Sequence, residues 1–76
     1  MDLRAVVGRN IKRLRVAKGL QQDALAHDCG IHVTYLSGIE NARRNMTLDV
    51  LERVAAGLGV SEAELVSRSE NGDKNC

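Results

Sequence analysis

Small polar side chains that can form hydrogen bonds with base edges recur in the segment HVTYLSGIEN, residues 32–41. Thr34 can donate or accept a hydrogen bond, and its methyl group can contact a thymine methyl. Ser37 follows almost one helical turn later, on the same face. A helix with such a face fits the major groove of DNA, where base edges are accessible. We therefore expect this segment to form a helix that reads DNA.

Two histidines and a cysteine near this segment raise the question of a metal site, but their spacing argues against one. His27, Cys29 and His32 follow the pattern H-x-C-x2-H, which is not a standard zinc pattern and lacks a fourth ligand. Cys29 stands where a small apolar residue packs at a helix turn. The sequence also shows no paired carboxylates and no phosphate-binding glycine loop, so we expect neither an enzyme nor a cofactor. A redox or metal sensor acting through Cys29 is the weakest alternative.

Positive charge is concentrated in two stretches of the chain. The net charge is only +1, yet residues 1–20 hold six basic side chains and one acidic one. Residues 21–40 hold three acidic side chains and no Lys or Arg, and Arg43 and Arg44 follow directly. Two guanidinium groups in a loop beside a reading helix suit phosphates or an adjacent groove. The alternatives are a solvated basic face on the first helix and a solvated loop.

Helical periodicity predicts the elements that must position these groups. Apolar residues recur at steps of three and four, which predicts helices over residues 2–18, 21–28, 32–40 and 47–57 and a short one ending near residue 67. The residues expected to face the core are Leu3, Val7, Ile11, Leu14, Leu25, Ala26, Ile31, Leu36, Ile39, Leu48, Leu51, Val54, Ala55 and Leu58. Proline is absent, Tyr35 is the only aromatic residue, and no stretch alternates as a strand would. The fold class is therefore predicted to be all-α.

Turn and cap residues mark the ends of the predicted helices. Gly30 suits a turn with positive φ between the second and third helices. Thr47 is expected to cap the fourth helix, and Ser61 with Glu64 forms a capping-box pattern for the fifth. The residues expected to end the fourth helix are Gly57 and Gly59.

The length of 76 residues predicts one domain, over residues 1–67, with a flexible polar tail over 68–76. A chain this short buries only about 60% of its unfolded surface, so a second copy is the expected source of added stability. The two cysteines are far apart in the sequence, no signal peptide is visible, and no apolar run approaches the roughly 20 residues that span a bilayer. We therefore expect a cytoplasmic protein without a membrane segment.

Residues 8–66 resemble the phage-repressor-like (XRE-type) helix-turn-helix domains. The landmarks that carry the resemblance are Gln22, Leu25-Ala26, Gly30-Ile31, Tyr35-Leu36-Ser37, Ile39-Glu40, Arg43-Arg44 and Leu58-Gly59-Val60. It implies a compact five-helix fold like that of the lambda repressor and a sequence-specific DNA-binding transcription regulator. Three residues depart from the family pattern. Ala42 replaces the usual glycine, Met46 the usual proline, and Gly38 a longer polar side chain.

The resemblance also implies roles for individual residues. Those at positions that face base edges are His32, Val33, Thr34, Ser37 and Gly38. Those at positions that contact phosphates are Gln21, Gln22, Asn41, Arg43 and Arg44. Arg15 and Glu40 match a structural pair that ties the first helix to the end of the third.

Within this family, the runs GRNIKRLR, HVTYLSGIE and RRNMTL are most similar to restriction-modification controller proteins. That similarity implies a homodimer that binds paired operator sites in double-stranded DNA and both activates and represses promoters. Acidic residues such as Asp49 and Glu52 are candidates for contact with RNA polymerase. The dimer surface is expected on the fifth helix and the end of the fourth, where apolar residues exceed the need of a small core: Val60, Leu65 and Val66. The alternative is a protein-interaction module, such as an antitoxin.

Overall fold

The computed structural model describes residues 2–68 of the chain, which fold into five helices joined by turns and loops. The helices are α1 (Leu3–Ala17), α2 (Gln22–Cys29), α3 (Val33–Glu40), α4 (Leu48–Leu58) and α5 (Glu62–Val66). These residues contain no strand, so the all-α prediction is confirmed. None of the helices in this described part is long and apolar enough to cross a membrane. The predicted tail lies outside the described residues, except for Arg68.

Side-chain caps begin α4 and α5 where the sequence predicts them. The Thr47 hydroxyl accepts a hydrogen bond from the Val50 N–H at 3.1 Å. The Ser61 hydroxyl accepts one from the Glu64 N–H at 3.3 Å, and the Glu64 carboxylate accepts one from the Ser61 N–H at 3.0 Å. Each cap satisfies backbone donors that the first turn of a helix leaves without a partner.

Glycines act at two kinds of position in the helical region. Gly30 and Gly59 follow α2 and α4 with φ of 72° and 71°, a conformation that a side chain would strain. The prediction that Gly57 ends α4 is wrong, because this residue lies inside the helix. A Cβ at Gly57 would lie only 3.0 Å from the Cys29 sulfur, so the missing side chain lets α4 approach α2.

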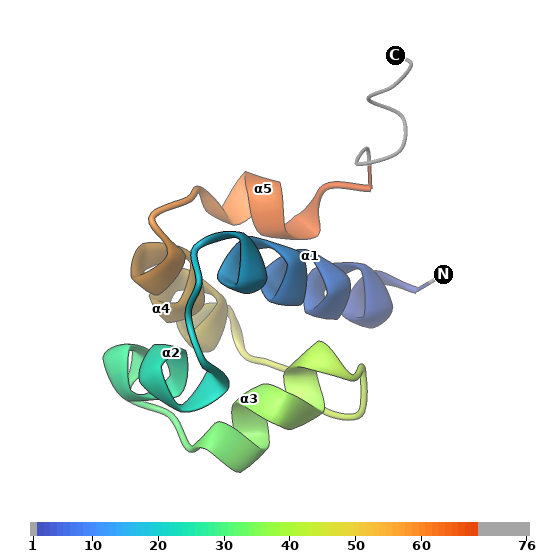
Figure 1. Ribbon diagram of the computed structural model, residues 1–76. Coiled ribbons are helices and arrows are strands. Elements are labelled where there is room, and N and C mark those ends of the chain that lie inside the picture. The colour runs from blue at the N-terminus through green and yellow to red at the C-terminus, as the bar shows by residue number, and fades with distance from the viewer. Residues whose placement is uncertain (1, 69–76) are drawn as a thin grey trace.

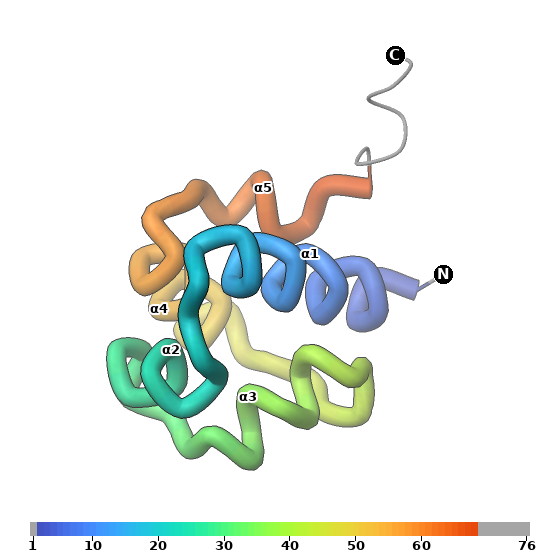
Figure 2. The backbone as a smooth tube through the Cα atoms, in the orientation of Figure 1, coloured from blue at the N-terminus to red at the C-terminus, as the bar shows by residue number. Residues whose placement is uncertain are grey.

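The first helix, α1, lies between α5 on one side and α3 on the other (Figure 1), and the backbone tube shows the same order (Figure 2). The α2 helix packs against α3 and α4. A Cβ on Gly8 would overlap the Ile39 carbonyl oxygen, so the backbones of α1 and α3 meet closely there. The buried core between the helices comprises Val7, Ile11, Leu25, Ala26, Cys29, Leu36, Ile39, Val54, Ala55, Leu58 and Leu65. One face of α3 is thereby fixed against the core.

A buried asparagine attaches α5 to α1, which sequence reasoning missed. Asn10 is only 1% exposed, and its amide nitrogen donates to the carbonyl oxygens of Leu65 at 2.8 Å and Ser67 at 2.9 Å. These carbonyl oxygens stand at the end of a helix, where no backbone N–H of the helix donates to them. Asn10 therefore replaces the missing C-terminal bonds of α5 and holds it on the core.

Two leucines that the periodicity assigns to the core are exposed. Leu48 is 81% exposed and Leu3 is 47% exposed. Both are the first residues of their helices, α4 and α1, and so extend past the edge of the packed core. The prediction that these two side chains face the core is wrong, and the result is an apolar surface.

Candidate nucleic-acid interface

The α3 helix packs one face on the core and presents the other outward. Leu36 and Ile39 are at most 2% exposed. Thr34 and Asn41 are exposed and Ser37 is half-buried, and their spacing places them on the face opposite the core. The Asn41 side-chain amide donates to the Ser37 carbonyl oxygen at 2.8 Å, which orients that amide at the end of the helix. The outward face thus carries hydroxyl and amide groups.

The N-terminal end of α3 is open to contact. His32 is the N-cap residue and is exposed, and its side chain makes no capping hydrogen bond. Val33 is 41% exposed. Together with Thr34, these residues cover the end of the helix that in helix-turn-helix proteins contacts base edges. Three of the five residues predicted to face bases therefore lie together on an open surface.

A buried ion pair joins α1 to the end of α3. Arg15 Nε lies 2.7 Å from Glu40 Oε2, and the two side chains are 11% and 2% exposed. Arg15 Nη2 donates to the second carboxylate oxygen at 3.0 Å, and Nη1 donates to the Leu20 carbonyl oxygen at 2.8 Å. Hydrogen bonding to Glu40 raises the pKa of Arg15, so the guanidinium stays charged despite its burial. The two residues predicted as a structural pair are in direct contact.

The two glutamines at the start of α2 differ in their freedom. Gln21 is exposed at the N-cap position and makes no side-chain capping bond. Gln22 is half-buried, and its amide nitrogen donates to Glu40 Oε1 at 3.0 Å. The same carboxylate therefore orients Arg15 and Gln22. This arrangement fixes the start of α2 relative to the end of α3.

The loop after α3 folds back on that helix. Ala42 has a positive φ of 62°, which accounts for the glycine usual at this position in the family. The N–H groups of Arg43 and Arg44 both donate to the Gly38 carbonyl oxygen, at 2.8 and 3.2 Å. Both predicted DNA-contacting arginines are exposed beside α3.

Tyr35 attaches the loop to α3 a second time. Its hydroxyl donates to the Asn45 carbonyl oxygen at 3.0 Å, and the Arg44 guanidinium carbon lies 5.9 Å from the ring centroid. Sequence reasoning noted Tyr35 only as the single aromatic residue and as a family landmark, and missed this role. No local pattern signals the bond to Asn45, since it depends on how the loop folds back.

Gly38 does not present an open position on the outward face. A Cβ built on Gly38 would lie 2.5 Å from Cγ of Arg44, because the arginine side chain covers the glycine. The space that a longer side chain would occupy at this position is thus filled from the loop. This structure explains the departure from the family pattern at Gly38.

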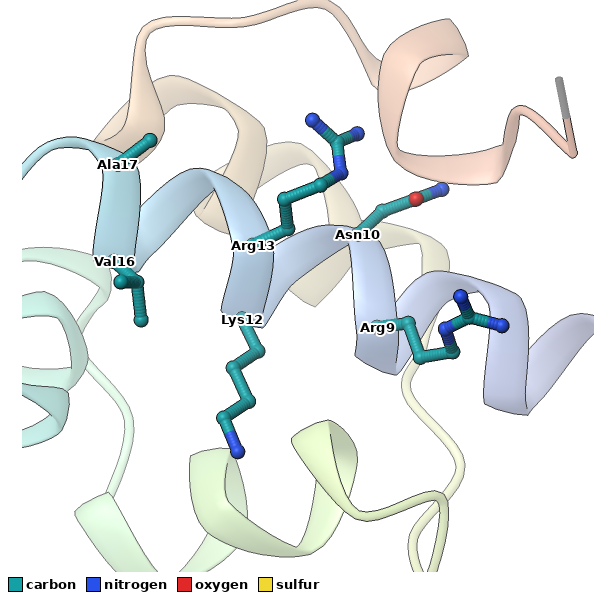
Figure 3. Close-up of a pocket in the computed structure, with 6 residues that line it drawn as sticks. All are labelled: Arg9, Asn10, Lys12, Arg13, Val16 and Ala17. Atoms are coloured by element: carbon teal, nitrogen blue, oxygen red, sulfur yellow. The ribbon is translucent and has the colours of Figure 1, made fainter. Parts of the chain in front are cut away.

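The basic residues of α1 do not all lie on one side of the helix (Figure 3). Figure 3 shows Lys12 extending toward α3, whereas Arg13 extends in the opposite direction, toward α5. The Val16 side chain, which is 59% exposed, points to the same side of α1 as Lys12 (Figure 3). Of the basic side chains that Figure 3 draws, Lys12 is therefore best placed to accompany α3.

The residues considered for metal binding or redox sensing do not form a site. Cys29 is buried, and its thiol donates to the Arg53 carbonyl oxygen at 3.6 Å. Burial raises the pKa of the Cys29 thiol, which disfavours the reactive thiolate. His27 and His32 are exposed, and no three metal-ligating side chains gather within residues 2–68.

An apolar groove lies between the starts of α1 and α4, near the end of α5. Residues that line it include Leu3, Val7, Met46, Leu48, Leu51 and Val66. Of the three residues predicted at a dimer surface, Val66 lines this groove and Val60 is half-buried against the core. The premise that the Leu65 side chain is not needed in the core is wrong, because this side chain is completely buried in the core.

Comparison with known proteins agrees with this architecture. The helix-turn-helix family model matches residues 11–65. A hypothetical transcription factor from Neisseria meningitidis is 45% identical over 65 residues, which cover 86% of this chain and 61% of the relative. The control protein C.BamHI of Bacillus amyloliquefaciens is 34% identical over 76 residues, 99% of this chain and 91% of that protein.

A solved structure has the same fold. The restriction-modification controller protein C.AhdI from Aeromonas hydrophila is similar with a TM-score of 0.80 and 34% identity, over 82% of this chain and 94% of that one. The chain thus spans less than two thirds of the Neisseria relative but nearly all of these two controller proteins. The predicted fold and resemblance are confirmed. The relatives of the chain are transcription regulators and not enzymes. The chain belongs to the XRE-type helix-turn-helix family and is a DNA-binding transcription regulator of the controller-protein type.

Proposed function

We propose that this protein is a homodimeric regulator that reads a pseudo-palindromic operator with α3 in the major groove. The observation that carries the proposal is the outward face of α3, where Thr34, Ser37 and Asn41 stand opposite a fully packed face. Hydroxyl and amide groups are the donors and acceptors that base edges recognise. The exposed Arg43 and Arg44 place positive charge at the edge of the same helix.

Phosphate contacts would set the position of α3 in the groove. Gln21 is exposed at the N-terminus of α2, and Asn41 and Arg43 are exposed at and after the end of α3. The hydrogen bond from the Gln22 amide to Glu40 holds the start of α2 near that end of α3. Phosphate contacts from these residues would fix the register of α3 on DNA without carrying sequence information.

A second copy of the chain is the partner we assign to the apolar groove. Leu48, at 81% exposed, is the largest apolar group left uncovered among the described residues. One eight-residue helix reaches only a few base pairs, so a single copy has little means of selecting a site. A two-fold dimer would place two α3 helices in successive major grooves, about 34 Å apart. In this proposal the interface is centred on the groove that Leu48 and Val66 line.

Selection of bound sequences from random double-stranded DNA tests the proposal. The full chain should enrich two inverted half-sites whose centres are separated by about one helical turn. Leu48→Asp should convert the dimer to a monomer in sedimentation experiments and weaken binding to the two-half-site DNA. Glu52→Asp, a change at an exposed position of the same helix, is the control and should alter neither property. Enrichment of no sequence, or of a single half-site only, would contradict the proposal.

The exposed groove also supports a second candidate function, a protein-interaction module of the antitoxin kind. An uncovered Leu48 suits an apolar partner as well as a second copy. The two functions differ in solution, because an antitoxin module whose groove awaits another protein stays monomeric in isolation. We favour the regulator, for which we also propose a cytoplasmic location. RNA polymerase contact through the exposed Asp49 or Glu52 is a further proposal, testable by transcription from the selected site in vitro.

A further inference from the structure

The outward face of α3 contains a side chain that comes from outside the helix. Arg44 covers Gly38, and a Cβ on this glycine would lie 2.5 Å from Arg44 Cγ. Gly38 follows Thr34 by four residues, so the two share one side of the helix. The arginine therefore occupies the position next to Thr34 that a side chain of α3 would otherwise fill.

The loop holds Arg44 in this place at several points. Its own N–H and that of Arg43 donate to the Gly38 carbonyl oxygen at 3.2 and 2.8 Å. The Tyr35 hydroxyl fixes the next residue through the Asn45 carbonyl oxygen at 3.0 Å. The backbone that carries Arg44 is thus attached to α3 on both sides of the arginine.

The side chain of Arg44 is also restrained. Its guanidinium carbon lies 5.9 Å from the centroid of the Tyr35 ring, a distance at which a cation is attracted to the ring face. Arg44 as a whole nevertheless remains exposed. A guanidinium that is already oriented loses less entropy when it binds a planar partner. Arg43, by contrast, shows no side-chain hydrogen bond, ion pair or ring contact within residues 2–68.

We propose that Arg44 is a specificity-determining residue that recognises a guanine in each half-site, in place of a side chain at position 38. This inference rests on the proposed function, since it requires α3 to lie in the major groove. The O6 and N7 atoms of guanine are the acceptors that a guanidinium contacts with two hydrogen bonds. A phosphate offers no base information, so the two kinds of contact make different predictions for the same residue.

Selection experiments on matched variants distinguish a base contact of Arg44 from a phosphate contact. Wild type, Arg44→Lys, Arg44→Ala and Arg43→Ala would each be applied to random double-stranded DNA. We expect both Arg44 variants to lose the preference for guanine at one position per half-site, by about 10-fold or more, while the other positions keep theirs. Arg43→Ala should keep every preference. If the Arg44 variants retain all preferences and weaken all sequences alike, the inference is wrong.

A change in the DNA tests the same contact without altering the protein. Replacing the assigned guanine by 7-deazaguanine removes the N7 acceptor and leaves base pairing intact. Wild type should bind this DNA several-fold more weakly, whereas Arg44→Ala should bind both DNAs equally. An equal loss for wild type and Arg44→Ala would overturn the inference. Failure of the proposed function is distinguishable, because wild type would then enrich no sequence at all.

Discussion

Two arginines attached to α3 show how the same side chain serves different purposes. Arg15 is nearly buried, contacts Glu40 through two nitrogen atoms, and joins α1 to the end of α3. Arg44 is exposed and lies over Gly38 and the Tyr35 ring, with no carboxylate partner among the described residues. The hydrogen bonds of the Arg15 guanidinium are made within the fold, whereas the Arg44 guanidinium remains available for a ligand. The comparison indicates that the same type of charged side chain can stabilise the fold or bind a ligand, and that its partners within the protein determine which of the two it does.

The buried pair gives the largest expected effect. Glu40→Ala should lower the free energy of unfolding by about 3–5 kcal/mol, because it leaves the Arg15 guanidinium buried without its partner. Chemical denaturation measures the change. Glu52→Ala removes an exposed glutamate and serves as the matched control, with an expected change within about 0.5 kcal/mol. Equal stability of the two variants would show that the pair does not hold α3 in place.

Substitutions on the outward face of α3 should weaken DNA binding and leave the free energy of unfolding nearly unchanged. Thr34→Ala is expected to cost about 1–3 kcal/mol of binding free energy at a single base position, with little change in unfolding. Gel shifts on the selected site and its single-base variants measure this. A uniform loss over all sequences would place Thr34 at the phosphates and contradict direct readout.

Arg43 should behave as a simple charge. Arg43→Ala is expected to weaken binding to every sequence by about 1 kcal/mol or less, since the side chain is exposed. The slope of log affinity against log salt concentration should fall by about 0.9, the value for one lost phosphate contact. A salt titration on specific and random duplexes provides the measurement. An unchanged slope would remove Arg43 from the interface.

The smallest effect is expected at Ala42, where the loop begins. Its φ of 62° is unfavourable for a residue with a Cβ. Ala42→Gly should therefore raise the free energy of unfolding by about 0.5–1 kcal/mol. Thermal denaturation would detect the increase. A loss of stability would show that residue 42 does not have a strained positive φ in solution.

Much of the fold follows from local patterns. The spacing of Leu36 and Ile39 places one face of α3 inward, and the chemistry of Gly30, Thr47 and Ser61 defines the ends of helices. Such signals depend on residues close in sequence, which explains why each predicted helix matches the structure. The inward face of a helix also defines the outward one, so the candidate reading surface could be located from sequence.

Other features depend on contacts between distant residues. Asn10 is an ordinary polar residue in the sequence, yet it is buried because α5 ends against it. Leu48 continues the apolar spacing of α4 but lies beyond the edge of the core. The cover that Arg44 forms over Gly38 requires a loop that folds back on α3. No local pattern contains this information, since each case depends on the tertiary arrangement.

We propose that the outward face of α3 and the loop beside it form the DNA-contacting surface. Titration of the isotope-labelled protein with its selected duplex, monitored by amide chemical shifts, locates this surface residue by residue. We expect the largest shift changes at Thr34, Ser37, Asn41 and Arg44, and small changes at Ala63 on α5. The largest changes on the outer side of α1 or on α5, with α3 unaffected, would contradict this proposal.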